Sequence, residues 1–119
     1  MKTRYQDIDP YQTLDGSEIR ELMHPRLHGE GALSLAEALV QPGASTRLHR
    51  HLQTEEHYHF TQGEGMMSLG DQVFPVNTGD TVRIPPGTAH KVMNTGNVPL
   101  RILCACAPAY RHEDTQILD

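Results

Sequence analysis

The sequence predicts an all-β fold, and three observations support this prediction. Gly and Pro recur at short intervals between residues 42 and 99, which leaves room only for short strands. The residues between these turns include many that favour strands, among them Val73, Val76, Val82, Ile84, Val92 and Ile102. Two histidines, His49 and His51, stand at i and i+2, a spacing that puts both on one face of a strand. Together these features favour an antiparallel sandwich or barrel.

The N-terminal part, residues 1–30, is expected to form an arm with edge strands. Asp15-Gly16 has the composition of a turn. The segment after it, Ser17 to Met23, fits either a short edge strand or an irregular arm, and the sequence leaves both open.

The segment from Leu33 to Val40 is the hardest element to assign. Its Leu, Ala and Glu residues have high helix propensity. It is nevertheless only a short run before Pro42-Gly43, and an isolated helix of that length is marginal in water. We therefore predict a strand here.

We expect residues 1–119 to form a single domain, with the barrel core at 31–107 and a polar tail at 108–119. The tail is expected to wrap the outside, anchored by Tyr110. Cys104 and Cys106 are too close in sequence for an unstrained disulfide and are interpreted as small buried apolar residues. A redox or metal role for these thiols is the alternative.

Composition narrows the range of partners. The chain has 119 residues and a formal net charge of -5, a balance that argues against nucleic acid and against an anionic membrane surface. It has no long apolar run of membrane-spanning length and no recognisable secretion signal, so a cytoplasmic location is expected.

Four side chains of metal-binding type are grouped in two segments bounded by turns: His49, His51, Glu56 and His90. Imidazole and carboxylate suit divalent iron, manganese, nickel, cobalt or zinc. Three imidazoles and one carboxylate would leave two positions open on a six-coordinate metal, and open positions are typical of catalytic sites. One such metal per chain is expected.

Two spaced motifs contain these four residues. In the first, Gly43 is followed by His49-x-His51, then by Glu56 and Gly63; in the second, Gly79 is followed by Pro85, Gly87, His90 and Asn94. The spacings resemble the paired motifs of the cupin superfamily, G-x5-H-x-H-x3-4-E-x6-G and G-x5-P-x-G-x2-H-x3-N, and every signature position is filled. The short interval between the motifs is similar to that of small single-domain cupins.

The resemblance implies a double-stranded β-helix, which is a jelly-roll barrel with a metal inside. By position, its metal ligands fall on His49, His51, Glu56 and His90. Glu55 is the alternative to Glu56, but the spacing to Gly63 favours Glu56.

Strand alternation extends the predicted site. Tyr58 and Phe60 share the face of Glu56 and, with Met67 and Leu69, are expected to line the substrate pocket. Arg47 has the parity of His49 and is a candidate for the pocket mouth. Tyr58 and Arg47 are the candidate catalytic residues. The same alternation turns two further histidines, His57 and His59, outward.

Three functions follow from such a site, all on a small organic molecule. The first is a metal-dependent dioxygenase, which the similarity of the ligand set to that of cupin dioxygenases favours. The second is a redox-neutral isomerase, epimerase, lyase or cyclase acting on a sugar or polyketide, with the metal as Lewis acid. The third is a binding module without catalysis, since a fold does not fix a reaction.

A homodimer is also expected. A small barrel has free sheet edges that invite covering, and Tyr5, Tyr11 and Leu14 of the N-terminal arm are candidates to cover the edges of a partner subunit.

Overall fold

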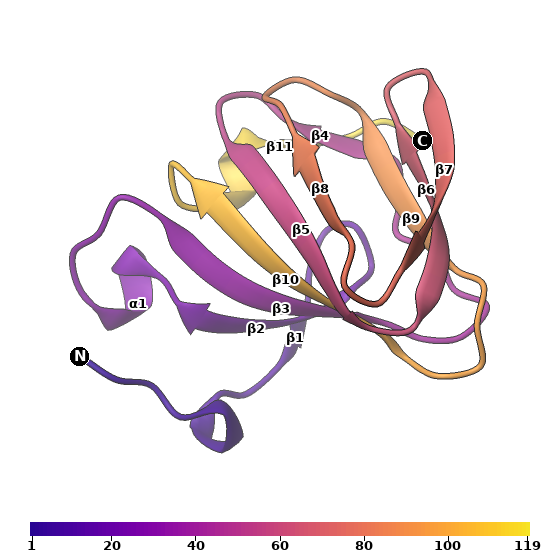
Figure 1. Ribbon diagram of the computed structural model, residues 1–119. Helices are drawn as coiled ribbons and strands as arrows, with labels where there is room; N and C mark the ends of the chain where they lie inside the picture. Colours follow the sequence, from indigo (N-terminus) through magenta and orange to yellow (C-terminus); the bar gives the residue numbers. More distant parts are fainter.

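The computed structural model describes residues 1–119, and its strands form two antiparallel sheets that close into a barrel (Figure 1). The first sheet has the order β1 (Tyr11–Gln12), β2 (Glu18–Met23), β3 (Ser34–Val40), β10 (Leu100–Ala107), β5 (Glu55–Gln62) and β8 (Thr81–Ile84). The second has the order β11 (Thr115–Ile117), β4 (His49–His51), β9 (His90–Asn94), β6 (Glu64–Leu69) and β7 (Gln72–Asn77). The predicted all-β, jelly-roll fold is confirmed.

Helical structure is limited to short pieces outside the sheets. They are a 3-10 turn η1 (Tyr5–Asp7), one turn of helix α1 (Pro25–His28) and a second 3-10 turn η2 (His112–Asp114). None of these could cross a membrane.

The core lies between the sheets and consists of inward residues from both. Along β5 the buried residues Glu56, Tyr58 and Phe60 alternate with the exposed residues His57 and His59, as the sequence predicts. The largest fully buried side chains, each less than 2% exposed, include Phe60, Met67, Ile84, Leu100 and Ile102.

The predicted strand before Pro42 is confirmed as β3. Its residues alternate between buried and half-buried, with Ser34, Ala36, Ala38 and Val40 facing inward. It pairs with β2 on one side and with β10 on the other. Pairing on both edges and burial of one face therefore override the helix propensity of its Leu and Ala residues.

The segment after Asp15-Gly16 forms β2, which resolves the alternative that the sequence left open. It is an inner strand and not an edge, because the two-residue β1 pairs with it on the outside. Gly16 has a φ of 93°, and its amide donates to the carbonyl of Thr13, so the predicted turn is present.

The C-terminal tail adds an edge strand to the second sheet. Its strand β11 pairs with β4 in the register Thr115 with His51 and Ile117 with His49. Tyr110 holds the start of the tail, since its amide donates to the Ser34 hydroxyl at 2.9 Å and its own hydroxyl lies 3.1 Å from that of Thr13.

The N-terminal arm lies against its own chain. The Tyr5 hydroxyl donates to Glu37 at 2.6 Å, and the Tyr11 hydroxyl donates to Glu21 at 2.8 Å. The homodimer stays a prediction.

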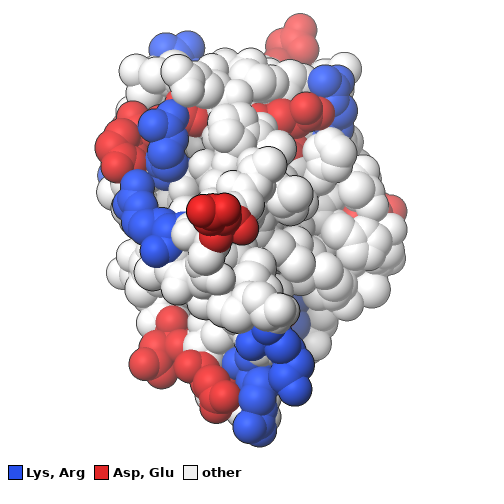
Figure 2. Space-filling view, turned by 90° about the vertical axis from the view of Figure 1, so that its left-hand side faces the viewer, with Lys and Arg blue, Asp and Glu red and all other residues white.

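On one face of the molecule acidic and basic residues are interspersed around a largely uncharged area (Figure 2).

Candidate metal centre

Three histidines from two neighbouring strands converge inside the barrel. His49 and His51 lie on the inward face of β4, and His90 begins β9 directly opposite His49. Their exposed fractions are 2%, 4% and 0%, and one ring nitrogen from each lies within 4.8 Å of those from the other two. The turn that precedes His90 is tied to β4, because the Gly87 amide donates to the His51 carbonyl. This bond joins the two motifs.

Glu56 reaches the histidines from the opposite sheet. Its Oε1 atom lies 3.1 Å from Nε2 of His51 and 3.6 Å from Nε2 of His90. Glu55 points outward instead and accepts a hydrogen bond from Arg83 at 2.6 Å. The structure therefore brings all four predicted ligands together and places Glu56, rather than Glu55, at the site.

The second nitrogen of each imidazole is held by a defined partner. Nδ1 of His49 lies 2.7 Å from the carbonyl of Arg47, and Nδ1 of His90 lies 2.9 Å from the carbonyl of Thr88. Because a carbonyl can only accept, both Nδ1 atoms carry the hydrogen. Their Nε2 atoms are then free to bind a metal through the lone pair, as is common for ligating histidines.

His51 follows the same pattern through a side chain. Its Nδ1 atom lies 2.9 Å from the Thr115 hydroxyl, which itself donates to the carbonyl of Arg111 at 3.1 Å. The hydroxyl hydrogen is thus engaged, and Thr115 accepts from His51. The sequence did not identify any of these three partners.

This arrangement fits a divalent cation. The three Nε2 atoms are acceptors in the tautomers just derived, and a Glu56 oxygen faces those of His51 and His90. Nε2 of His90 is fully buried and has no hydrogen-bond partner, which is a costly state for a neutral protein group. A metal bound by His49, His51, His90 and Glu56 would satisfy these atoms at once.

The protonation states of the site also suit a metal. Burial is the main factor that lowers the pKa of His49, with a further contribution from His90. The imidazole is therefore held neutral, which is the form that ligates. Burial acts to raise the pKa of Glu56, but the electrostatic influence of the adjacent His51 and His90 outweighs it, so this pKa lies below its ordinary value and the group is a carboxylate.

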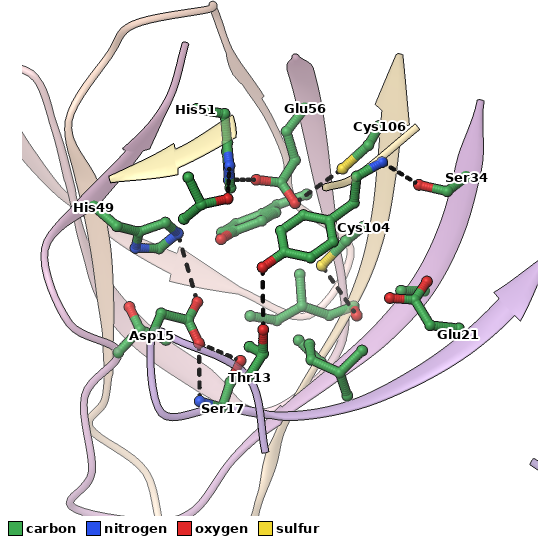
Figure 3. Close-up of a pocket in the computed structure, with 18 of the residues that line it drawn as sticks. Thr13, Asp15, Ser17, Glu21, Ser34, His49, His51, Glu56, Cys104 and Cys106 are labelled. Carbon is green, nitrogen blue, oxygen red and sulfur yellow. Dashed lines mark hydrogen bonds and ion pairs between the residues drawn. The ribbon is translucent and has the colours of Figure 1, made fainter. Parts of the chain in front are cut away.

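Asp15 is a second carboxylate at the site, and the sequence identified it only as a turn residue. Its Oδ2 atom lies 3.5 Å from Nε2 of His49, and the residue is 8% exposed. Its other oxygen, Oδ1, accepts from the amide of Ser17 at 2.9 Å and from the Ser17 hydroxyl at 2.6 Å. Figure 3 shows the loop of Asp15 and Ser17 facing His49 across the cavity.

A cavity adjoins this group and contains about 570 Å³ of space, part of it open to solvent. Its polar lining includes Thr13, Asp15, Ser17, Glu21, Ser34, Tyr110 and Thr115 as well as His49, His51 and Glu56 (Figure 3). Its apolar wall includes Ile19, Ala36, Ala38, Ile102 and Cys104. No Lys or Arg lines it.

Among the residues predicted for the pocket, Tyr58 lines the cavity. Phe60 and Met67 belong to the closed core instead, and Leu69 packs against that core. The reason is depth: the inward residues of β5 follow in the order Glu56, Tyr58 and Phe60, so Phe60 lies one step further from Glu56 along the strand than Tyr58 does. Strand parity gives the face of a residue and not its depth.

Arg47 does not face the cavity. Its guanidinium donates to the carboxylate of Asp119 at 3.1 Å and to the Asp119 carbonyl at 2.8 Å, and its side chain is 52% exposed. Its backbone carbonyl, which holds His49, is the part of Arg47 that contacts the site.

The two cysteines are free, buried and on the inward face of β10. Burial raises the pKa of Cys104 and of Cys106, with a further contribution from Glu56. The thiol of Cys106 donates to Oε2 of Glu56 at 3.3 Å, so it helps to fix the carboxylate through the oxygen that does not face the histidines. Their expected role as small buried groups agrees with these positions.

Fold and site together define the class of protein: a small β-barrel of cupin type with a three-histidine group able to hold a metal ion. The chain belongs to the cupin domain family, which matches residues 36–106. That segment begins within β3 and ends within β10, and all four predicted ligands lie within it.

Several known proteins are similar to this chain. An uncharacterized protein of Methanocaldococcus jannaschii, MJ1618, is 52% identical over 119 residues, which is 100% of this chain and 95% of that protein. Protein SchB of Streptomyces halstedii is 30% identical over 120 residues, covering 97% of this chain and 86% of SchB. These relatives share nearly the whole domain.

Solved structures agree with the fold. A predicted oxalate decarboxylase from Thermotoga maritima has a TM-score of 0.78 at 27% identity, covering 91% of this chain and 99% of that one. Pac13, a nucleoside dehydratase of Streptomyces, has a TM-score of 0.79 at 15% identity, covering 99% and 90%. The second likeness shows the fold alone.

Proposed function

We propose that this cupin is a metal-dependent enzyme that moves a proton on a small, uncharged or cationic organic molecule without net redox change. An isomerase, epimerase, lyase or cyclase is the reaction class. The observation that carries the proposal is the buried Asp15 carboxylate, whose Oδ2 atom lies 3.5 Å from Nε2 of His49 at the cavity wall. A redox-neutral reaction needs such a proton acceptor beside the metal.

His49, His51, Glu56 and His90 would hold the ion, and when bound it supplies Lewis acidity to a carbonyl or hydroxyl oxygen. The rest of the chemistry falls to the protein. Two hydrogen bonds from Ser17 fix Oδ1 of Asp15 and thereby orient Oδ2. Asp15 would take a proton from a carbon next to the substrate carbonyl and return it to another position or to a leaving group.

Tyr58 is suited to hold the substrate oxygen and not to act as a base. Burial raises the pKa of Tyr58 well above its ordinary value, so the phenol stays protonated. It lines the cavity, and its ring lies edge-on to His90 with centroids 5.9 Å apart. A neutral phenol can donate a hydrogen bond to an oxygen that gains charge during the reaction.

The charge of the cavity restricts the charge that the substrate can carry. Asp15, Glu21 and Glu56 line it, and no Lys or Arg does. A phosphorylated sugar or a dicarboxylate would bring further negative charge without a protein cation to pair with it. Neutral hydroxylated or carbonyl compounds are therefore favoured.

A dioxygenase is the second candidate, and it was the function that the sequence favoured. The three-histidine, one-glutamate group supports it, as does the apolar wall of Ala36, Ala38 and Ile102, against which an enol or a catechol would pack. A dioxygenase reaction does not require Asp15 as a proton acceptor, whereas the redox-neutral reaction does. The two candidate functions can therefore be distinguished by replacing Asp15.

The test begins with metal analysis of protein purified without added ions. Neutral ketones, hydroxyketones, catechols, flavonols and β-diketones are then incubated with the loaded protein in deuterated buffer, in air and under argon. We expect deuterium incorporation or isomer formation under argon, and an Asp15→Asn variant that keeps its metal but loses most of this activity.

Other outcomes have equally clear meanings. Oxygen uptake that stops under argon and survives Asp15→Asn would favour the dioxygenase. Turnover on neither panel by a fully loaded protein would favour a binding module and overturn the proposal.

A further inference from the structure

We propose that Glu21 is a specificity-determining residue that binds a hydrogen-bond donor, a hydroxyl or an ammonium group, at the end of the cavity distant from the metal ligands. The inference rests on the proposed function, because it assumes that the cavity holds the substrate. It adds the chemical form of that substrate: a metal-binding oxygen at one end and a donor group at the other.

The position of Glu21 is unusual for its strand. It lies in β2 on the same face as Ile19, with which it shares the inward direction, and it is only 7% exposed. A carboxylate is rarely buried on such a face unless it is paired. Glu21 nevertheless forms no ion pair: its cross-strand neighbour on β3 is Ala36, no Lys or Arg lines this cavity, and Arg26 and Arg111 lie in a neighbouring surface pocket that Glu21 also borders.

One oxygen of this carboxylate is satisfied and the other is not. Oε1 accepts the hydroxyl hydrogen of Tyr11 at 2.8 Å. Oε2 is buried and has no hydrogen-bond partner. Buried polar atoms are rarely left in this state, so an unpaired one in a cavity wall points to a ligand group that completes it.

The location of Glu21 separates it from the metal ligands. In Figure 3 Glu21 lies on the side of the cavity away from His49. A ligand that spans the cavity would meet the proposed metal centre at one end and the unpaired Oε2 atom of Glu21 at the other. Because the carboxylate of Glu21 accepts hydrogen bonds and repels negative charge, the end of the substrate near it is expected to carry no anionic group.

The test uses a homologous series of probes on Co²⁺-loaded protein, whose visible absorption reports ligands that enter the coordination sphere. Alkyl hydroxamates of increasing chain length supply a metal-binding head with an inert tail. The matched ω-hydroxy and ω-amino hydroxamates add a donor at each distance. We expect one chain length at which a donor tail binds about tenfold or more tighter than its methyl-ended counterpart.

The variants assign that preference to a residue. Glu21→Leu keeps the approximate size but removes both acceptor oxygens, so it is expected to abolish the preference for a donor tail while alkyl hydroxamates still bind and the metal content stays unchanged. Glu18→Leu, on the same strand but with a side chain 39% exposed, is the matched control and should behave as the wild type. The ω-hydroxy and ω-amino arms show which donor is preferred.

The outcomes distinguish failure of the role proposed for Glu21 from failure of the proposed function on which it rests. If no hydroxamate binds to fully loaded protein, the metal site does not take ligands from the cavity, and the proposed function fails. If alkyl hydroxamates bind but no donor tail is preferred at any length, or if Glu21→Leu keeps the preference, the role of Glu21 is overturned while the metal site stands.

Discussion

Nε2 of His51 lies 3.1 Å from Oε1 of Glu56, and the hydrogen on its other ring nitrogen, Nδ1, is donated in a hydrogen bond to the Thr115 hydroxyl. In the neutral tautomer two lone pairs thus face each other across a buried gap. Either a proton or a metal must lie between them, and the same holds for His90, whose Nε2 has no partner. The relation makes metal binding the simplest way to satisfy the centre of this barrel.

Replacement of a single ligand is expected to remove the metal. His49→Ala, His51→Ala, His90→Ala and Glu56→Ala should each lower the metal content from about one ion per chain to a small fraction of that. Elemental analysis of protein purified without chelators measures it. The control is His57→Ala, an exposed residue of β5 that should keep its metal. Retention of a full complement by two or more ligand variants would contradict the assignment.

Thr115→Val is expected to weaken metal binding without touching a ligand. The change removes the acceptor that fixes Nδ1 of His51. Loss of such a partner typically costs about 10–100-fold in affinity. Competition with a chromophoric chelator measures the change, and Thr115→Ser, which keeps the hydroxyl, should restore most of the affinity. Equal affinities for Val and Ser would show that this hydroxyl does not orient the ring.

Asn94→Ala is expected to destabilise the fold rather than the site. Its amide donates to the carbonyls of Val40 and Val98, and its oxygen accepts from the Gly96 amide. Removing a buried group of this kind leaves partners unsatisfied, so the free energy of unfolding should fall by about 1–3 kcal/mol. Urea unfolding at matched metal loading measures this.

The control for that measurement is the exposed Asn97. Asn97→Ala should change the free energy of unfolding by less than about 0.5 kcal/mol. An Asn94→Ala variant as stable as the wild type would instead mean that Val40 and Val98 find other donors.

The cysteines are expected to be unreactive in the folded protein. Burial raises the pKa of both thiols, so at neutral pH almost no thiolate is present to react. Because the shift is upward, a rise to pH 9 should still leave them protonated. Iodoacetamide labelling followed by mass spectrometry should modify neither residue in buffer and both in urea. Rapid labelling of folded protein would reveal an accessible thiolate and favour a redox role.

The ligands could be predicted from the sequence because fixed spacing and strand alternation determine them. The motif spacing places Glu56, and the parity of β5 separates it from Glu55. The strand at Ser34–Val40 was also predictable, since length and context outweigh propensity there. These are local properties of a chain with strong turn signals.

The cavity wall could not be predicted in the same way. Asp15 and Glu21 come from the N-terminal strands, and Tyr110 comes from the tail, so only the closed barrel brings them to the ligands. Parity could show that Phe60 faces inward but not that it lies in the closed core below the cavity, which depends on how the two sheets pack together. Depth and long-range contact are properties of the assembled sheets.

The docking of β11 beside β4 links occupancy of the centre to the edge of the barrel. Thr115, which steadies one imidazole, belongs to a strand of only three residues that is paired on a single side. Short edge strands open far more often than whole domains unfold. Release and uptake of a bound ion would therefore have a local route through fraying of this strand, and anything that clamps it in place would slow exchange in both directions.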